Sequence, residues 1–138
     1  MEIKVDVGEL EALLGRLQAA DGEKCIEAGM KMLAQRGVDI AKKNTPVGKT
    51  GLLRRNWRVK ETTPLKAVLI NPTKYAEYVE YGHRQKVGRF VPKLGKRLVE
   101  PWVRGQFYAQ KSGEIIRKNA DRIMAPVIEK EVDKIING

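Results

Sequence analysis

Three consecutive residues, Gly48, Lys49 and Thr50, could close a phosphate-binding loop of the form G-x-x-x-x-G-K-[ST]. The first glycine of that pattern would fall at position 43, which is Lys43 in this sequence. The loop also needs a strand before it and a helix after it, because the N–H groups at the helix start hold the phosphate. Here a helical pattern precedes the glycines and an alternating pattern follows them. We therefore expect no helix to begin after Lys49, and no nucleotide site.

Few other residues could perform catalysis or hold a metal. His83 is the only histidine and Cys25 the only cysteine, so neither a Cys/His zinc site nor an internal disulfide can be assembled. Cys25 falls in a predicted helix, where we interpret it as a small buried hydrophobe, and this cysteine usage indicates a reducing compartment. A catalytic triad would depend on His83, whose glycine-flanked basic loop is a poor support for a positioned base.

Two carboxylates, Glu77 and Glu80, could face one another across a helical turn. Beside so many cations, we interpret them as ion-pairing groups rather than as an acid–base pair. No acidic loop offers calcium ligands. The sequence thus predicts a protein that is not an enzyme and has no cofactor, metal or small-molecule substrate.

The positive charge is concentrated in two segments. The chain has 138 residues and a net charge of +10, from 27 Lys and Arg against 17 Asp and Glu. Ten of these cations lie in two segments that contain no acidic residue: Arg54, Arg55, Arg58 and Lys60 in the first, and Arg84, Lys86, Arg89, Lys93, Lys96 and Arg97 in the second. The rest of the chain carries equal numbers of basic and acidic residues. Such clusters attract nucleic acid or an acidic protein surface, or simply keep a protein soluble.

No targeting or membrane segment is expected. No apolar run approaches the roughly 20 residues of a membrane span. No apolar stretch typical of a signal peptide follows Met1. We therefore expect a protein that is cytoplasmic where it is made, and a single domain over residues 1–138.

The first part of the chain reads as a strand followed by helices. Ile3, Val5 and Val7 alternate with charged residues, which predicts a short strand. A first short helix is indicated by Leu10, Leu13, Leu14 and Leu17. A longer helix, capped by Asp21, is predicted to run to about Asn44. Its buried face would carry Ile26, Gly29, Met30, Leu33, Gly37, Ile40 and Ala41, and the two glycines suggest the close approach of another backbone.

The middle of the chain predicts a hairpin and a helical turn. Pro46 ends the long helix. Alternating residues predict one strand over residues 52–60, a turn over 61–64 and a more buried strand over 65–70. The sequence "YAEYVEYG" predicts a short helical turn that Gly82 terminates.

Residues 83–97, called the basic arm below, carry six cations without sustained periodicity and predict a long loop or an extended hairpin. Residues 98–109 predict a third strand, with Pro101 at an edge or bulge.

The last helix is predicted over 113–136, capped by Ser112 and kinked at Pro126. Its two apolar stripes are Ile116, Ala120, Ile123 and Val127, then Met124, Ile128, Val132 and Ile135. Either both stripes pack within one core, or the second faces a neighbouring subunit.

These elements predict an α+β fold. A small antiparallel sheet of about three to four strands would pack against the long helix of the N-terminal half and the kinked C-terminal helix. The basic arm would extend from this body as a loop or hairpin.

Two motifs, "TPVGKTGLLRRNW" and "NPTKYAEYVEYGHR", resemble a tail-completion family of long-tailed bacteriophages and prophages, whose members are head–tail joining or neck components. The family patterns T-P-V-x-x-G-x-L-R-x-x-W and Y-A-x-Y-V-E-x-G are met by Thr45, Pro46, Val47, Gly51, Leu52, Arg54 and Trp57, and by Tyr75, Ala76, Tyr78, Val79, Glu80 and Gly82. Leu53 shifts the usual spacing by one, and His83 replaces a common small hydroxyl residue. The resemblance covers roughly residues 20–136, and the C-terminal part resembles versions from contractile-tailed phages.

The resemblance implies a structural assembly protein. Relatives are similar in forming rings, commonly hexameric, between connector and tail, with a lumen through which DNA passes. The implied partners are further copies of the chain, connector or adaptor proteins, and tail terminator or tube proteins, first in the host cytoplasm and then in the virion or a phage-derived particle. In this interpretation Gly48 and Gly51 permit a turn from helix to sheet, and Trp57 anchors the sheet on the long helix.

Two sets of residues are the candidate contact sites. The candidates for the subunit interface are Tyr75, Tyr78, Glu80, Met124, Ile128, Val132 and Ile135. Arg84, Lys86, Arg89 and Lys93 of the basic arm would contact either DNA in the lumen or an acidic surface of a neighbouring ring. The alternative function is a free basic DNA-binding module, although the chain lacks a helix-turn-helix signature, zinc ligands or an RNA-recognition pattern.

Overall fold

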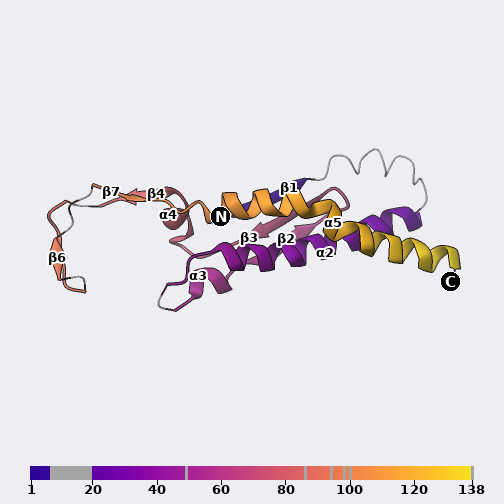
Figure 1. Ribbon diagram of the computed structural model, residues 1–138, viewed down its shortest axis with the longest axis horizontal. Coiled ribbons are helices and arrows are strands. Elements are labelled where there is room, and N and C mark those ends of the chain that lie inside the picture. Colours follow the sequence, from indigo (N-terminus) through magenta and orange to yellow (C-terminus); the bar gives the residue numbers. More distant parts are fainter. Residues whose placement is uncertain are drawn as a thin grey trace.

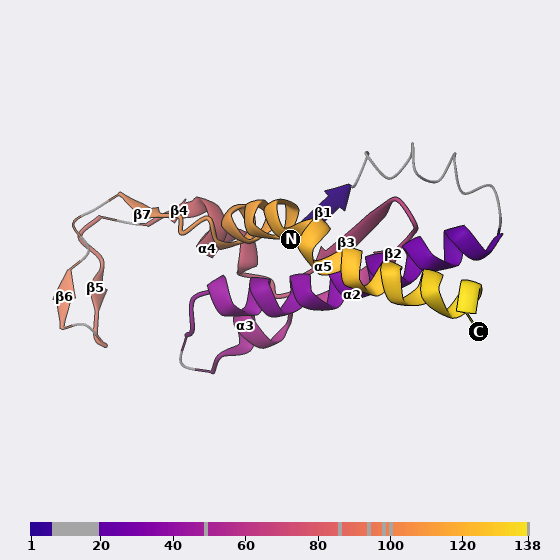
Figure 2. The same cartoon turned by 45° about the vertical axis from the view of Figure 1, so that its right-hand side comes forward.

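The computed structural model describes residues 1–6, 20–48, 50–85, 87–93, 95–97, 99 and 101–137, and Figures 1 and 2 show its ribbon from two directions. The predicted α+β fold is confirmed. Along the chain the elements are β1 (Glu2–Asp6), α2 (Ala20–Asn44), α3 (Leu52–Arg55), β2 (Arg58–Thr62), β3 (Lys66–Ile70), α4 (Ala76–Tyr81), β4 (Gly82–Arg84), β5 (Phe90–Val91), β6 (Lys96–Arg97), β7 (Trp102–Arg104) and α5 (Tyr108–Asn137). The short helix expected from Leu10 to Leu17 lies outside the described residues.

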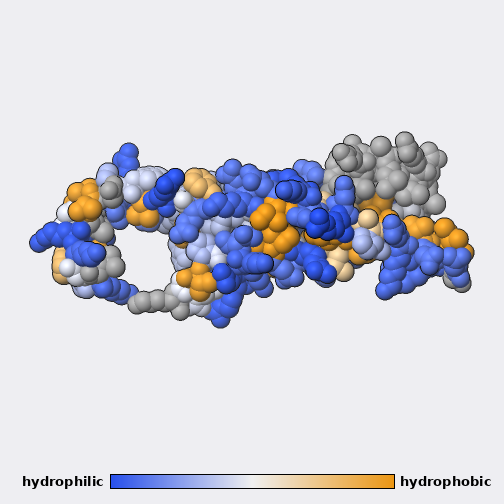
Figure 3. Space-filling view, in the orientation of Figure 1, coloured by the Kyte–Doolittle hydropathy of each residue, from blue (hydrophilic) through white to orange (hydrophobic). Residues whose placement is uncertain are grey.

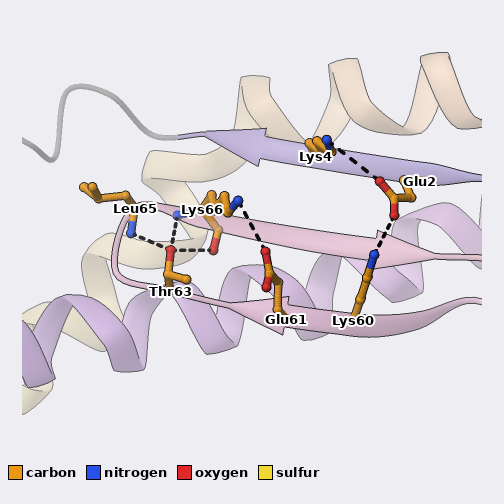
Figure 4. A network of polar contacts seen from close by, with 7 residues as sticks. All are labelled: Glu2, Lys4, Lys60, Glu61, Thr63, Leu65 and Lys66. Carbon is orange, nitrogen blue, oxygen red and sulfur yellow. Dashed lines mark hydrogen bonds and ion pairs between the residues drawn. The ribbon is translucent and has the colours of Figure 1, made fainter.

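Three antiparallel strands in the order β1-β3-β2 form the main sheet. Ile3 lies opposite Leu69 and Val5 opposite Ala67, and all four side chains are buried in the core beneath the two long helices α2 and α5 (Tyr108–Asn137). The other face is polar: the Lys60 ammonium lies 2.9 Å and the Lys4 ammonium 3.9 Å from the Glu2 carboxylate, while Lys66 lies 3.3 Å from Glu61 (Figure 4). The Lys60 hydrogen bond and charge lower the pKa of Glu2. This ladder of ion pairs is a solvated sheet face.

The core lies between the sheet and two long antiparallel helices, α2 and α5, which run side by side in both views (Figures 1 and 2). The predicted inner face of α2 is confirmed, since Ile26, Met30, Leu33 and Ala41 have no exposed surface. The expectation that a backbone approaches the α2 glycines was wrong, because side chains do so instead. A Cβ at Gly29 would lie 2.9 Å from Cγ1 of Ile128, and one at Gly37 would lie 3.1 Å from Cδ1 of Leu69.

The C-terminal helix α5 starts earlier than predicted and continues through Pro126. Ser112 does not cap it: this residue lies inside the helix, where its hydroxyl donates to the Tyr108 carbonyl at 2.6 Å. The axis of α5 changes direction along its length (Figure 2). Both stripes contribute to the core near their N-terminal ends, where Ile116, Ala120 and Met124 are buried, whereas Ile135 near the C-terminus is half exposed.

Two predicted strands were partly wrong. Residues 52–55 form the short helix α3, so the strand that was expected over 52–60 begins only at Arg58. The third strand, expected over 98–109, is limited to Trp102–Arg104, and Tyr108 already belongs to α5. In both cases a helix begins where alternating apolar residues favoured a strand. Buried contacts with distant residues hold these segments, and local propensity does not report them.

The basic arm is an extended hairpin. β4 pairs with β7, and β5 pairs with β6 farther out, both antiparallel. Together they make a two-stranded projection over residues 82–104, called the ribbon below, which extends away from the helices and the main sheet at the left of Figures 1 and 2.

Candidate interaction site

The first motif closes the C-terminal end of α2. Trp57 is 2% exposed, and its indole N–H donates to Oγ1 of Thr45 at 2.8 Å. That hydroxyl in turn donates to the Ala41 carbonyl at 2.5 Å. The Arg54 guanidinium donates to the Thr45 carbonyl through Nε at 3.1 Å and Nη2 at 2.9 Å. Thr45, Arg54 and Trp57 therefore act as one structural unit that satisfies the last carbonyls of the helix.

The glycine segment is a hinge and lacks the elements of a phosphate-binding loop. A helix, α2, enters it where that loop requires a strand. The expectation that no helix begins after Lys49 was wrong, because α3 starts at Leu52. That helix has only four residues and follows Gly51, whose φ of 64° is in the left-handed region. Lys49 itself is outside the described residues. The segment therefore joins two helices rather than a helix and a strand.

The second motif holds the beginning of α5. The Glu80 carboxylate is buried and accepts hydrogen bonds from the backbone N–H groups of Ala109 at 2.8 Å and Gln110 at 3.0 Å. A carboxylate at this position satisfies free N–H groups in the first turn and is favoured by the helix dipole. The interpretation of Glu80 as an ion-pairing surface residue was wrong. It is a helix cap contributed from 29 residues earlier in the chain.

Tyr108 joins the two motifs. Its ring is 1% exposed and meets the Trp57 ring edge-on, with centroids 6.2 Å apart. Its hydroxyl donates to the Ala76 carbonyl at 2.8 Å. Burial, and then the nearby Glu80 carboxylate, raise the pKa of the Tyr108 phenol well above its usual range. The phenol therefore stays protonated and keeps donating to α4.

The two ends of the ribbon meet backbone to backbone. A Cβ at Gly82 would collide with the Val103 carbonyl oxygen, and one at Gly105 would collide with the Glu80 carbonyl oxygen. Gly82, with φ of 88°, ends α4 as predicted. The backbone N–H of Phe107 donates to the Glu80 carbonyl at 3.0 Å, which adds a further tie. The base of the ribbon is thus fixed to the body of the protein.

The surface of the ribbon is basic. Its described cations are all exposed: Arg84, Arg89, Lys93, Lys96, Arg97 and Arg104. Within the described part of the chain, no carboxylate lies within 4.0 Å of any of them. Lys86, a predicted member of this set, lies outside the described residues. Figure 3 shows apolar and hydrophilic residues intermingled on the ribbon, at its left end.

The exposed aromatic residues gather at the same end of the molecule. Trp57 and Tyr108 are buried, but the other six aromatic side chains are at least 39% exposed: Tyr75, Tyr78, Tyr81, Phe90, Trp102 and Phe107. Two contacts between rings orient the aromatic side chains at the base of the ribbon. The ring of Tyr78 lies 5.6 Å from that of His83, and the ring of Tyr81 lies 6.5 Å from that of Phe107. This end of the protein offers aromatic and cationic groups together.

The interface candidates fall into three groups. Tyr75, Tyr78 and Ile135 are exposed, at 41%, 61% and 50% respectively. Glu80 and Met124 are each 2% exposed, and Ile128 packs against the core, so these three side chains serve the protomer's own interior. Val132 is partly buried.

Sequence reasoning missed the capping role of Glu80 and the full extent of the ribbon. Glu80 was visible as the second acidic residue of "YAEYVEYG", but no local signal connects it with a helix start 29 residues later. In the described ranges, no group of three or more His, Cys, Asp or Glu residues could hold a metal ion. None of the described helices is long and apolar enough to cross a membrane.

Fold and site together define an α+β scaffold that holds a basic, aromatic ribbon away from its body. A family model described as "Bacteriophage HK97-gp10, putative tail-component" matches residues 8–82, which include the first motif and the second motif as far as Gly82. The chain therefore belongs to the HK97-gp10-like family of bacteriophage tail components. Comparison with curated proteins and with solved structures finds no match. Most of the ribbon and all of α5 lie beyond the matched residues.

Proposed function

We propose that this tail component is a ring-forming subunit at the neck or tail end, where it joins or completes the tail. The observation that carries the proposal is the gathering of four exposed aromatic residues at the base of the ribbon: Tyr75, Tyr78, Tyr81 and Phe107. Aromatic residues and arginine are enriched in protein interfaces, and large apolar side chains left outside a well-packed core mark contact surfaces. The family membership supports a structural rather than a catalytic role.

A ring of identical subunits needs two different patches on each subunit, because each copy contacts the next in a head-to-tail manner. Tyr75 and Tyr78 supply one candidate patch beside the ribbon. Ile135 and Ile136, which are 50% and 73% exposed, supply another near the C-terminus of α5, at the far end of the molecule (Figure 1). We propose that these patches meet in a ring, with a hexamer as the expected form. Connector or adaptor proteins, and tail terminator or tube proteins, are the proposed neighbours above and below it.

Deleting the gene tests the function directly. We expect particles in which tails are incomplete or heads and tails remain separate, and we expect the wild-type gene supplied in trans to restore joined particles. Electron microscopy of the lysate provides the measurement. Normal particles with heads attached to complete tails in the deletion strain would refute the proposal.

A point variant then tests the patch beside the ribbon. Replacing Tyr78 by Ser removes a side chain that is 61% exposed, so the protomer should fold while particle assembly falls. Val47, which is 60% exposed in the hinge that follows α2, provides the matched control as Val47→Ser. Equal particle yields from both variants would remove Tyr78 from the proposed interface.

A further inference from the structure

Two cross-strand pairs on the ribbon each combine an arginine with an aromatic residue. Arg84 of β4 lies directly opposite Trp102 of β7, and Arg97 of β6 lies directly opposite Phe90 of β5. Directly opposed residues of an antiparallel pair project from the same face, with Cβ atoms about 5 Å apart. All four side chains are exposed, and Trp102 and Phe90 are 50% and 51% exposed. The ribbon thus presents the same pair of chemical groups twice along its length.

The charges around these pairs have one sign. Arg89, Lys93, Lys96 and Arg104 are exposed on the ribbon as well, and its described residues include no Asp or Glu. The Arg97 guanidinium is oriented by a hydrogen bond from Nη1 to the Gly88 carbonyl at 2.9 Å. A face that combines guanidinium groups, ammonium groups and flat apolar rings matches a polymer of phosphates and bases.

We propose that the ribbon binds nucleic acid without sequence preference. Its Lys and Arg side chains contact phosphates, and Trp102 and Phe90 stack on bases where these are unpaired. Protein interfaces are depleted in lysine and usually combine both signs of charge, so the basic character of the ribbon's described residues favours nucleic acid over an acidic protein. A two-stranded ribbon is also narrow enough to enter a major groove or to follow a single strand.

The anchor at the base of the ribbon gives this surface a defined direction. Glu80, Gly82 and Gly105 fix both of its ends to α4 and α5, and the ribbon extends beyond the body of the protein (Figure 1). This inference deepens the proposed function by naming a partner for the ribbon. It rests on the proposed function only for the place at which the ribbon would meet nucleic acid. Binding by the purified protein is therefore tested separately from particle assembly.

A matched pair of charge variants tests the inference. One variant carries Arg84→Gln, Arg89→Gln, Lys93→Gln and Lys96→Gln on the ribbon. Its control carries Lys24→Gln, Lys111→Gln, Lys118→Gln and Lys130→Gln at four exposed helical positions, which changes the net charge equally. Each is titrated against a 30-base-pair duplex and a mixed-sequence 30-nucleotide single strand at several salt concentrations. Circular dichroism verifies that both variants are folded.

We expect the ribbon variant to reduce the slope of log affinity against log salt by about 3 on duplex DNA, and to lose on the order of a hundredfold in affinity at about 0.1 M salt. The control should resemble the wild type. An equal loss in both variants, or no loss in either, would overturn the inference. Ribbon-dependent binding to poly-glutamate without binding to either DNA would overturn it in favour of an acidic protein partner.

Aromatic variants test the stacking contribution. Phe90→Ala and Trp102→Ala should each lower affinity for the single strand by on the order of tenfold and leave duplex affinity almost unchanged. Val99→Ala, at a ribbon position that is 77% exposed, is the control for loss of apolar surface. Single-strand affinities that do not differ among the three variants would contradict stacking by the aromatic side chains.

Discussion

The indole N–H of Trp57 donates to the Thr45 hydroxyl at 2.8 Å, and both residues are almost fully buried. This hydrogen bond joins the beginning and the end of the first motif, which contains the glycines that superficially resemble a phosphate-binding loop. The residue types in that segment are explained by the closure of α2, because Arg54 binds the Thr45 carbonyl and Tyr108 packs against Trp57. Its glycines serve a turn, and Thr45, Thr50 and Arg54 make hydrogen bonds with the protein's own backbone.

Removing the Thr45 hydroxyl should destabilise the fold. In Thr45→Val the Trp57 N–H remains buried without its acceptor, which costs about 1–3 kcal/mol in the free energy of unfolding. Val47→Ala, at an exposed position in the same hinge, should change stability by less than about 0.5 kcal/mol. Urea unfolding followed by tryptophan fluorescence measures both values. Equal stabilities for the two variants would show that the hydrogen bond has little importance.

Glu80 and Glu77 should respond differently to the same substitution. Glu80→Gln replaces a buried carboxylate that accepts two backbone N–H bonds, and an amide can accept only through its oxygen. We expect a loss of about 1.5–3 kcal/mol, together with faster amide exchange in the first turn of α5. Glu77 is exposed, and Glu77→Gln should have little effect on either quantity. Unchanged exchange at Ala109 and Gln110 in Glu80→Gln would contradict the capping role.

The backbone contact at the base of the ribbon should not tolerate a side chain. Gly105→Ala places a Cβ against the backbone of Glu80 and Tyr81, so we expect destabilisation by about 2 kcal/mol or more. Gly48→Ala is the control, because a Cβ there meets no atom within 4 Å. Thermal unfolding compares the two. A Gly105→Ala protein as stable as Gly48→Ala would mean that the ribbon is not held by this contact.

Tyr108 should contribute to alkaline unfolding. The folded-state pKa of its phenol is raised by burial and by Glu80, while in the unfolded chain it ionises at about 10. The stabilisation is therefore complete below about pH 10 and is lost as pH rises above that value. Tyr108→Phe should be less stable by about 1 kcal/mol at neutral pH, because it lacks the hydrogen bond to Ala76. Its stability should also decline less steeply than that of the wild type between about pH 10 and 11. Parallel declines would contradict this assignment.

The sequence predicted what depends on local periodicity. The long helix α2, the strands β1 and β3, and the helical turn ended by Gly82 follow from spacing and from Pro and Gly positions. The start of α5 was not predictable in this way. Its cap, Glu80, comes from another element, so the local signal at Ser112 suggested a start that is too late.

The candidate site could be predicted only in part. Composition identified the cationic segment, but the register that places Arg84 opposite Trp102 and Arg97 opposite Phe90 depends on how the hairpin closes. Glu80 was singled out as a surface residue, whereas it is a buried helix cap, because the burial of a side chain depends on the assembled fold. The buried residues of both motifs proved to be structural, whereas the exposed candidates for contacts are Tyr75 and Tyr78 of the second motif and the ribbon that follows.

The central claim, that copies of this chain form a ring at the neck or tail end, is tested most directly by electron cryo-microscopy of purified particles. The account predicts closed-ring density at that position into which this fold docks, with α5 ends and the Tyr78 surface at the contacts between copies. Purified particles that contain no copy of the chain, or that contain it elsewhere than at a tail end or neck, would contradict the account.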